Sequence, residues 1–364
     1  MANISYKCPT CGAEIFWSAE KGCFDCKYCG DSFTIEQMKE AGAIVDQEID
    51  ENKAEKHEEI VEGEYTESND GTVGSDLVKY TCSHCGAEII TDRSTAATIC
   101  VYCGNAVIMS EQIIKGFAPD YVIPFKIQKD KVMDAFKKFS KKPLTPNDFD
   151  CDKVLEKMQG VYIPFWLYSG KCNGVMSGEG INERSWTSGN YRYTEKKYYD
   201  VMRDGTVAFQ KVPVDASSKT EDDAMDSIEP YDFKEMVDFT PAYLSGFLAE
   251  RYDEDSAKCF PRAKERIENT TLDELIKSCS YDRVEVKNYN HETVIDETKY
   301  AMLPTWLLYT TYKDKKYFFA MNGQTGKFIG NLPISKVKLI IYSLLGTVGG
   351  GFIGWLLGIA GLFS

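Results

Sequence analysis

The chain has 364 residues, 43% of them hydrophobic and 27% charged, a composition typical of a globular protein that excludes disorder throughout. The length predicts two or three domains, with enough chain for one sizeable core. The net charge is −14, and there are thirteen cysteines. The N-terminal "MANISYKCPTC" lacks the basic and apolar regions of a signal peptide. We therefore expect this part in the reducing cytoplasm, where closely spaced cysteines bind metal rather than form disulfides.

A decapeptide occurs twice, as "YKCPTCGAEI" from Tyr6 and as "YTCSHCGAEI" from Tyr80. Each copy begins a set of four cysteines, with two residues inside each pair and fourteen between the pairs. Two residues between thiolates let both sulfurs reach one Zn²⁺ at about 2.3 Å, and the glycine after each pair permits a positive φ. The spacing predicts two zinc ribbons, each with a closed, structural site and one Zn²⁺. The expected ligands are Cys8, Cys11, Cys26 and Cys29 in the first ribbon and Cys82, Cys85, Cys100 and Cys103 in the second.

One extra cysteine leaves the first ligand set open. Cys23 precedes Cys26 by three residues, so the pair Cys23/Cys26 could replace Cys26/Cys29. We favour Cys29 because a glycine follows it, as a glycine follows the last cysteine of the second copy.

The segment between the two ribbons, residues 35–78, is predicted to be an acidic linker. From Ala41 to Val78 there are twelve acidic residues and two lysines. Such a segment buries too little apolar surface to offset the entropy of ordering. A helical spacer from about Thr34 to Glu59 is the alternative.

Many zinc ribbons bind nucleic acid, which requires a basic surface. Tyr6 to Asp31 contains three lysines and four acidic residues, and Lys79 to Gly104 contains only one lysine and one arginine. The acidic linker would also repel phosphate. We therefore expect the ribbons to contact protein or to be purely structural.

The central part is predicted to be an α+β domain with an antiparallel sheet packed on helices. "KDKVMDAFKKF" places Val132, Phe136 and Phe139 on one helical face, and "TLDEL" at Thr271 matches a capping box. Hairpin turns are predicted at Asp204-Gly205 and around Asn322-Gly323.

Three apolar stretches, "VIPFKI", "YIPFWLYSG" and "MLPTWLLYT", are expected to be strands. The last two share Pro-x-Trp-Leu, starting at Pro164 and Pro304, which suggests two related halves. Proline in a strand belongs at its start or on a sheet edge, so we expect these prolines there.

No catalytic motif is visible, and the chain is not expected to be an enzyme. There are three histidines, His57, His84 and His291, and no triad or H-E-x-x-H motif. "NGQTGKF" departs from the phosphate-binding loop, with Met321 in place of the first glycine and Phe328 in place of Ser/Thr. The other cysteines are interpreted as ordinary thiols.

The segment from Leu339 to Phe363 has twenty-five residues and no charge, which predicts one transmembrane helix. Lysines just before it indicate a cytoplasmic bulk and a single-pass protein of the cell membrane. A re-entrant hairpin broken at Gly349–Gly351 is the alternative. Glycines recur every fourth residue and would let another helix approach closely, through self-association or with a different protein. These glycines are Gly346, Gly350, Gly354 and Gly358.

Together the stretches "VIPFKI", "GVYIPFWLYSG", "VPVDASSK", "YLSGFLAERYD" and "LPTWLLYTTYKDKKYFFAMNGQTGK" resemble a family of bacterial zinc-ribbon membrane proteins of the transcription-factor-IIB ribbon type. The resemblance covers most of the chain from Tyr80 onward. Family members often carry a replication-restart or primosomal helicase label, which the missing ATPase motifs do not support here. The resemblance implies partners among membrane-stress proteins of the phage-shock and flotillin-like kinds.

These observations predict a membrane-anchored, cytoplasm-facing zinc-ribbon adaptor that binds protein partners, with a membrane-tethered nucleic-acid-binding protein as the alternative. The expected domains are zinc ribbons at 1–34 and 79–108, the acidic linker at 35–78, the α+β domain at 109–335 and the membrane anchor at 336–364.

Overall fold

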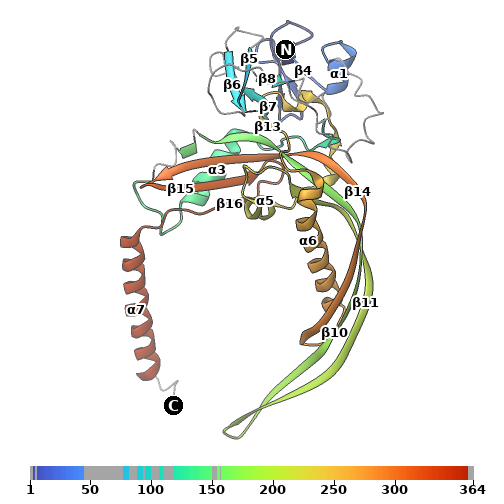
Figure 1. The fold of residues 1–364 in the computed structure, drawn as a ribbon. Coiled ribbons are helices and arrows are strands. Elements are labelled where there is room, and N and C mark those ends of the chain that lie inside the picture. The colour runs from blue at the N-terminus through green and yellow to red at the C-terminus, as the bar shows by residue number, and fades with distance from the viewer. Residues whose placement is uncertain are drawn as a thin grey trace.

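A computed structural model gives the fold (Figure 1). It describes residues 3–4, 6–44, 77–81, 88–92, 95–99, 106–109, 118–149, 154–155 and 157–359. The strands are β1 (Asn3–Ile4), β2 (Phe16–Ser18), β3 (Cys23–Asp25), β4 (Ser32–Phe33), β5 (Leu77–Thr81), β6 (Glu88–Asp92), β7 (Thr95–Ile99), β8 (Ala106–Met109), β9 (Tyr121–Val122), β10 (Gln159–Ser188), β11 (Tyr191–Asp215), β12 (Val237–Asp238), β13 (Leu248–Glu250), β14 (Arg283–Tyr312), β15 (Lys315–Asn322) and β16 (Phe328–Gly330). The α-helices are α1 (Ile35–Glu40), α3 (Lys129–Ser140), α5 (Asp222–Ile228), α6 (Ser256–Lys277) and α7 (Lys336–Ile359), and the 3₁₀ helices are η2 (Phe233–Glu235) and η3 (Pro241–Leu244).

The α+β class is confirmed, but the sheet is mixed rather than antiparallel. Eleven strands form it, and its main path runs β1-β8-β7-β13-β10-β14-β15-β16. Most neighbours are antiparallel, whereas β13 pairs with β10 and β9 pairs with β14 in parallel. Two short strands thus enter the sheet from loops, which the hydrophobic pattern did not indicate.

The two proline motifs lie side by side at the centre of the sheet, because β10 and β14 pair antiparallel with Ile163 opposite Leu303. Pro164 and Pro304 are therefore inside two interior strands, neither at a strand start nor on a sheet edge as expected. Each proline falls where its strand changes partner. β10 leaves β13 after Tyr162 and meets β11 at Phe165, and β14 leaves β9 after Met302 and meets β15 at Thr305. At such a change a missing N–H interrupts no ladder.

The two tryptophans of these motifs have matching partners. The indole N–H of Trp166 donates to the Glu254 carbonyl oxygen, and that of Trp306 donates to the Ile127 carbonyl oxygen, both at 2.9 Å. The two halves therefore resemble each other in strand pairing and in hydrogen bonds, as well as in the Pro, Trp and Leu that their motifs share.

Beyond the body, β10, β11 and β14 continue as a curved arm with α6 along its concave side (Figure 1). β11 runs without interruption through Asp204-Gly205, so the hairpin turn predicted there was wrong. The hairpin turns instead at Gly189, whose φ is +60°, between β10 and β11. Asp-Gly here lies within a ladder against β10, where long-range pairing overrides its turn preference.

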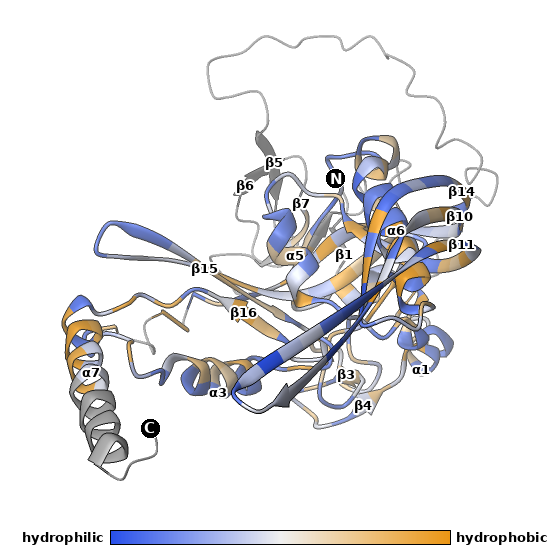
Figure 2. Cartoon of the chain, turned by 90° about the horizontal axis from the view of Figure 1, so that it is seen from below, coloured by the Kyte–Doolittle hydropathy of each residue, from blue (hydrophilic) through white to orange (hydrophobic). Residues whose placement is uncertain are grey.

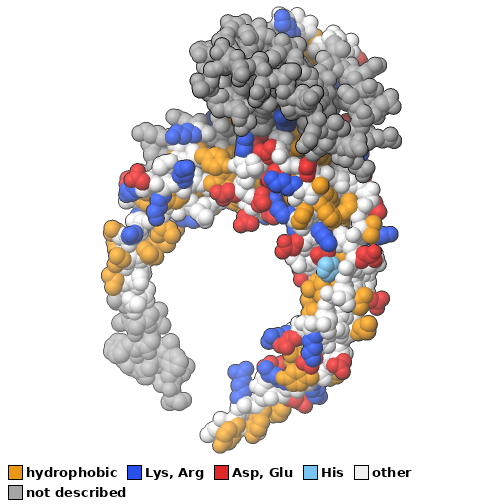
Figure 3. All heavy atoms as spheres, in the orientation of Figure 1, with side chains coloured by type: hydrophobic (Ala, Val, Ile, Leu, Met, Phe, Trp, Pro, Cys, Tyr) orange, Lys and Arg blue, Asp and Glu red, His pale blue; other side chains and the backbone are white. Residues whose placement is uncertain are grey.

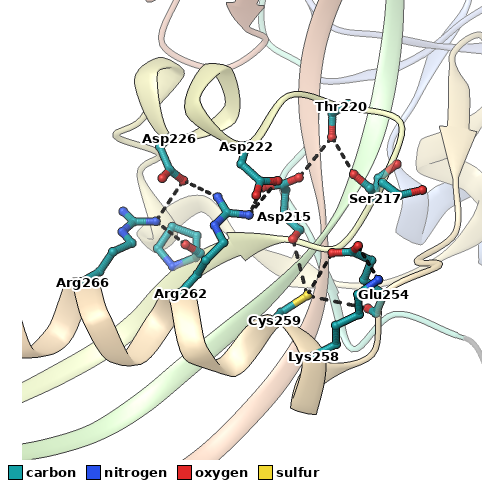
Figure 4. A network of polar contacts seen from close by, with 12 residues as sticks. Asp215, Ser217, Thr220, Asp222, Asp226, Glu254, Lys258, Cys259, Arg262 and Arg266 are labelled. Atoms are coloured by element: carbon teal, nitrogen blue, oxygen red, sulfur yellow. Dashed lines mark hydrogen bonds and ion pairs between the residues drawn. The ribbon is translucent and has the colours of Figure 1, made fainter.

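A network of ion pairs fixes α6 to the base of the arm (Figure 4). The Arg262 guanidinium lies 2.9 Å from Asp215 of β11, 2.9 Å from Asp222 and 3.0 Å from Asp226 of α5. Arg266 binds Glu229 at 2.7 Å. Because α6 begins earlier than predicted, at Ser256, residue Thr271 is not a cap.

Two local predictions are confirmed. Helix α3 spans Lys129–Ser140 and buries Val132 and Phe136, as its periodicity predicts. The turn around Asn322-Gly323 joins β15 to β16, with the Asn322 N–H donating to the Lys327 carbonyl oxygen at 2.9 Å.

The predicted membrane anchor is wrong, and the single-pass localisation falls with it. Among the residues that the structure describes, no helix is long and apolar enough to cross a membrane. Side chains of α7 are described as far as Thr347, and this part includes Lys336 and Lys338. It falls short of the roughly 20 apolar residues that a span requires. Its early turns are largely hydrophobic (Figure 2), and their apolar side chains are exposed.

The predicted packing of a second helix against the glycines of this segment depended on the transmembrane helix, so it is not supported. All four glycines, Gly346, Gly350, Gly354 and Gly358, fall within the bounds of α7. At Gly346 a Cβ would meet nothing within 4 Å, so no second helix packs there within the described residues.

Candidate metal centre

The first cysteine set is held by two short hairpin ends. A bridge between Lys7 and Glu14 encloses the first pair of cysteines, and the pairing of Asp25 with Ser32 encloses the second pair. In each turn a glycine has positive φ, +71° at Gly12 and +82° in the second. The glycine N–H donates back to the carbonyl oxygen of the first cysteine of its pair, at 2.9 Å in both. These turns bring each pair of thiols to one side of the backbone.

The four predicted sulfurs meet at one point. The ligand atoms of Cys8, Cys11, Cys26 and Cys29 all lie within 4.8 Å of one another. The Sγ atoms of Cys8 and Cys29 are 3.6 Å apart, as are those of Cys11 and Cys26. Four sulfurs placed tetrahedrally at about 2.3 Å from one Zn²⁺ would be about 3.8 Å apart. The donor set and its spacing therefore fit a metal ion, and Cys23 is not among the four.

Backbone N–H groups supply part of the electrostatics of the site. Those of Cys29 and Tyr28 lower the pKa of the Cys26 thiol to about 7, against the opposing effect of desolvation. The N–H of Asp31 lowers the pKa of Cys29, but desolvation and the other three sulfurs raise it to about 12. Metal binding requires all four thiolates, so affinity for the metal must fall as the pH is lowered.

Apolar packing attaches this ribbon to the body. Phe24 is fully buried inside the ribbon, and Trp17 packs edge-on against Tyr243 of η3, with ring centroids 4.8 Å apart. Helix α1, assigned to the linker by the sequence, folds back on the ribbon and buries Met38 completely. The hydrophobic core is continuous from the ribbon into the domain. The hydrophobic pattern gave no signal for this contact, because a Trp in a short strand can face solvent or a neighbour equally well.

The second cysteine set, Cys82, Cys85, Cys100 and Cys103, lies outside the described residues. The strands on either side of it are described. Thr81 pairs with Glu88, and Ile99 pairs with Ala106. These two pairs match Lys7 with Glu14 and Asp25 with Ser32 of the first ribbon, each shifted by the same 74 residues that separate the decapeptides.

Within the described residues, the other residues considered for chemistry serve the fold. Asn322 is fully buried and donates to the carbonyl oxygens of Ile228 and Pro230, while Gln324 binds the backbone of Asp232. The "NGQTGK" loop therefore holds the segment after α5 in place through hydrogen bonds to its backbone. His291 Nδ1 lies 2.8 Å from the Glu268 carboxylate of α6.

The structure also presents a feature that the sequence analysis missed. Beyond Ile181, where β14 begins to pair, β10 and β11 project as a two-stranded hairpin. Its tip exposes Trp186, Tyr191 and Tyr193 to 44%, 72% and 47%. Aromatic residues close to a turn were the available signal, but their exposure depends on the end of β14, which has no local signature.

Comparison with known proteins gives one informative match. No protein-family model matches the chain, and no solved structure matches it. The chain is similar to "Uncharacterized protein YdjG" of Bacillus subtilis (strain 168), with 35% identity over 353 residues, which cover 96% of this chain and 96% of that protein. Identity at this level along nearly the whole of both chains means that the chain belongs to the same family as YdjG.

Proposed function

We propose that the chain is a zinc-ribbon adaptor, a protein without catalytic activity that holds two zinc ions and binds a protein partner. A site closed by four thiolates has no open position for a substrate, which supports a structural role for the metal. The matching strand pairs around the second cysteine set support a second site of the same kind.

The aromatic hairpin tip is the observation that carries the partner-binding part of this proposal. Trp186 and Tyr193 stack with ring centroids 5.7 Å apart, and the Arg184 guanidinium lies 5.9 Å from the Trp186 ring. Hydrophobic side chains gather at this end of the arm (Figure 3). Trp, Tyr and Arg provide much of the binding energy in protein interfaces, and pre-stacked rings lose little entropy on binding.

Metal analysis tests the zinc part of the proposal. The purified full chain should contain two zinc ions per chain. Cys8→Ser/Cys11→Ser and Cys82→Ser/Cys85→Ser should each retain one, while Cys23→Ser, the matched control, should retain two. One zinc per wild-type chain would contradict the paired sites.

Affinity capture from extract, with and without nuclease treatment, tests the partner. The baits are wild type, Trp186→Ala/Tyr193→Ala, and Tyr309→Ala, which removes an exposed ring away from the tip. A protein captured by wild type and by the Tyr309 variant, but lost with the tip variant, is the expected result. Capture that depends on intact nucleic acid would favour the nucleic-acid alternative, and identical captures by all three baits would exclude the tip as the docking surface.

A further inference from the structure

One edge of the arm has no strand beside it. Among the described residues β11 pairs with β10 alone, so the other edge of β11 is free along the arm (Figure 1). The ladder with β10 is regular from Tyr191 to Phe209, and a bulge interrupts it at Lys211, where φ is +57°. Within this stretch the Arg203 guanidinium donates to the Met202 carbonyl oxygen at 2.9 Å, a local contact of a flexible side chain. Unpaired N–H and C=O groups along such an edge can pair with another strand.

The side chains on one face of this stretch carry charges in a regular order. Val201 is buried in a cluster with Leu275 of α6, so the residues that alternate with Val201 and its like along β11 lie on the convex side of the arm. The convex-side residues from 192 to 204 are all exposed, and they are, in order, Arg192, Thr194, Lys196, Tyr198, Asp200, Met202 and Asp204. Two cations precede Tyr198 by six and two residues, and two anions follow it by two and six. The pattern is symmetric in position about Tyr198 and opposite in sign.

Antiparallel pairing of this edge with the same edge of a second copy of the chain would match these charges. With Tyr198 opposite Tyr198 of the second copy, Lys196 lies opposite Asp200 and Arg192 lies opposite Asp204, and two-fold symmetry repeats each pair. Opposite charges directly across a strand pair stabilise it, whereas like charges destabilise it. On the concave side this register brings no like charges together, because it places Lys197 opposite Tyr199, Glu195 opposite Val201 and Tyr193 opposite Arg203.

We propose that β11 pairs with β11 of a second copy in a two-fold dimer centred on Tyr198. Such an interface must be self-complementary, as this sequence of charges is. Centring the pair on Lys196 or on Asp200 instead would place that charge opposite itself. The regular edge is long enough, since the turn at Gly189 of the second copy would lie opposite Val207, before the bulge at Lys211. The dimer goes beyond the proposed adaptor role, and it would give the adaptor two aromatic tips.

A purely structural explanation accounts for only part of the pattern. Charged side chains on an exposed edge discourage indiscriminate pairing, which explains why charges are present. It does not explain the reversal of sign at Tyr198, or why that ring is 60% exposed between the charges. Lys196 already lies 3.2 Å from Glu183 of β10, but both side chains are half-exposed. Within the described structure no ion pair engages Arg192 or Asp204, so the test uses these two residues.

Sedimentation velocity of the full chain over a range of concentrations tests the proposal. The variants are Arg192→Asp, Asp204→Arg and the charge exchange Arg192→Asp/Asp204→Arg. The matched control Lys171→Asp reverses an exposed charge on the same convex side, opposite Ala208, but on β10 and away from the free edge. Thermal unfolding of each variant checks that it is folded.

We expect wild type and the control to form a dimer with the same dissociation constant. Each single variant should weaken the dimer about tenfold, since like charges then face each other twice. The charge exchange should restore the wild-type dissociation constant, because opposite charges again face each other. The proposal is overturned if wild type stays monomeric up to about 100 µM. It is also overturned if the single variants dimerise like wild type, if the control weakens the dimer as much as they do, or if the charge exchange does not restore it.

Discussion

The buried carboxylate of Asp215 shows how one residue affects stability at the base of the arm. Asp215 is 1% exposed, and its partners are the Arg262 guanidinium and the Thr220 hydroxyl. Burial raises the pKa of this carboxyl group, and Arg262 lowers it by a smaller amount. Although Asp215 is ion-paired, its carboxyl group therefore binds a proton more tightly in the folded state than in the unfolded chain.

The sign of the resulting pH dependence follows from linkage. A carboxyl group with a raised folded pKa is protonated in both states at low pH, and above its ordinary value of 3.8 the folded state retains more protons. The stability of wild type relative to Asp215→Asn should therefore fall as the pH rises from below 3.8 through the folded pKa, and then level off. Urea unfolding of both proteins across this range checks the direction, and a relative stability that rises with pH would contradict it.

Breaking the ion pair from the arginine side should be more costly. Arg262→Met leaves Asp215 buried without its cation, and removing one partner of a buried pair costs about 3–5 kcal/mol. Arg262 is partly exposed, so we expect the lower end of that range. Urea unfolding at neutral pH measures the loss, with Arg184→Met at the exposed tip as a control that should change stability by less than about 0.5 kcal/mol.

At the scale of elements, two glycines let the arm curve. The β10–β14 pairing shifts register at Gly170 and at Gly178. A Cβ at either position would lie 2.2 Å from a backbone carbonyl oxygen of β14. Gly178→Ala should therefore destabilise the protein by about 1–3 kcal/mol, because backbone and not a flexible side chain must move.

A matched glycine separates this close contact from a general effect of alanine in a strand. At Gly205 of β11 a Cβ meets its nearest neighbour, a Leu275 methyl group, at 3.3 Å. Thermal unfolding should show a much smaller change for Gly205→Ala than for Gly178→Ala. Equal changes would mean that the register shift at Gly178 does not need glycine.

Elements with a local signal were predictable, and those set by partners far along the chain were not. The periodicity of "KDKVMDAFKKF" predicts α3, because the residues of its buried face recur in adjacent turns of the same segment. The Asp204-Gly205 turn was mispredicted, because β11 gains a continuous ladder with β10 on both sides of it. Likewise, the positions of Pro164 and Pro304 inside strands depend on where β13 and β9 end, which no local pattern encodes.

At the scale of the whole molecule, the metal site was more predictable than its surroundings. Cysteine spacing alone predicts the cluster of Cys8, Cys11, Cys26 and Cys29, because a four-cysteine metal site of this kind takes its ligands from two short local turns. The anchoring of the ribbon on η3 and the hairpin projecting past β14 could not be predicted. Both depend on contacts between segments more than 90 residues apart, such as Trp17 with Tyr243 and Ile181 with Arg283.

Metal removal should therefore act locally before it acts on the body. Without the ion, the four clustered cysteines lose the metal–sulfur bonds that hold the ribbon turns together. Helix α6 and the β10–β11–β14 arm keep their own core and ion pairs. Amide hydrogen exchange with a chelator should lose protection in residues 6–44 first and leave 160–215 protected. Lowering the pH should have the same effect, because protons compete with the metal for thiolates.

The variant Cys8→Ser/Cys11→Ser should show the loss of protection without chelator, and added zinc should restore protection in wild type but not in this variant. Simultaneous loss over both regions would mean that ribbon and arm unfold as one unit. Unchanged protection in 6–44 would mean that apolar packing, with Phe24 inside the ribbon and Trp17 against Tyr243 of η3, holds the ribbon without the ion.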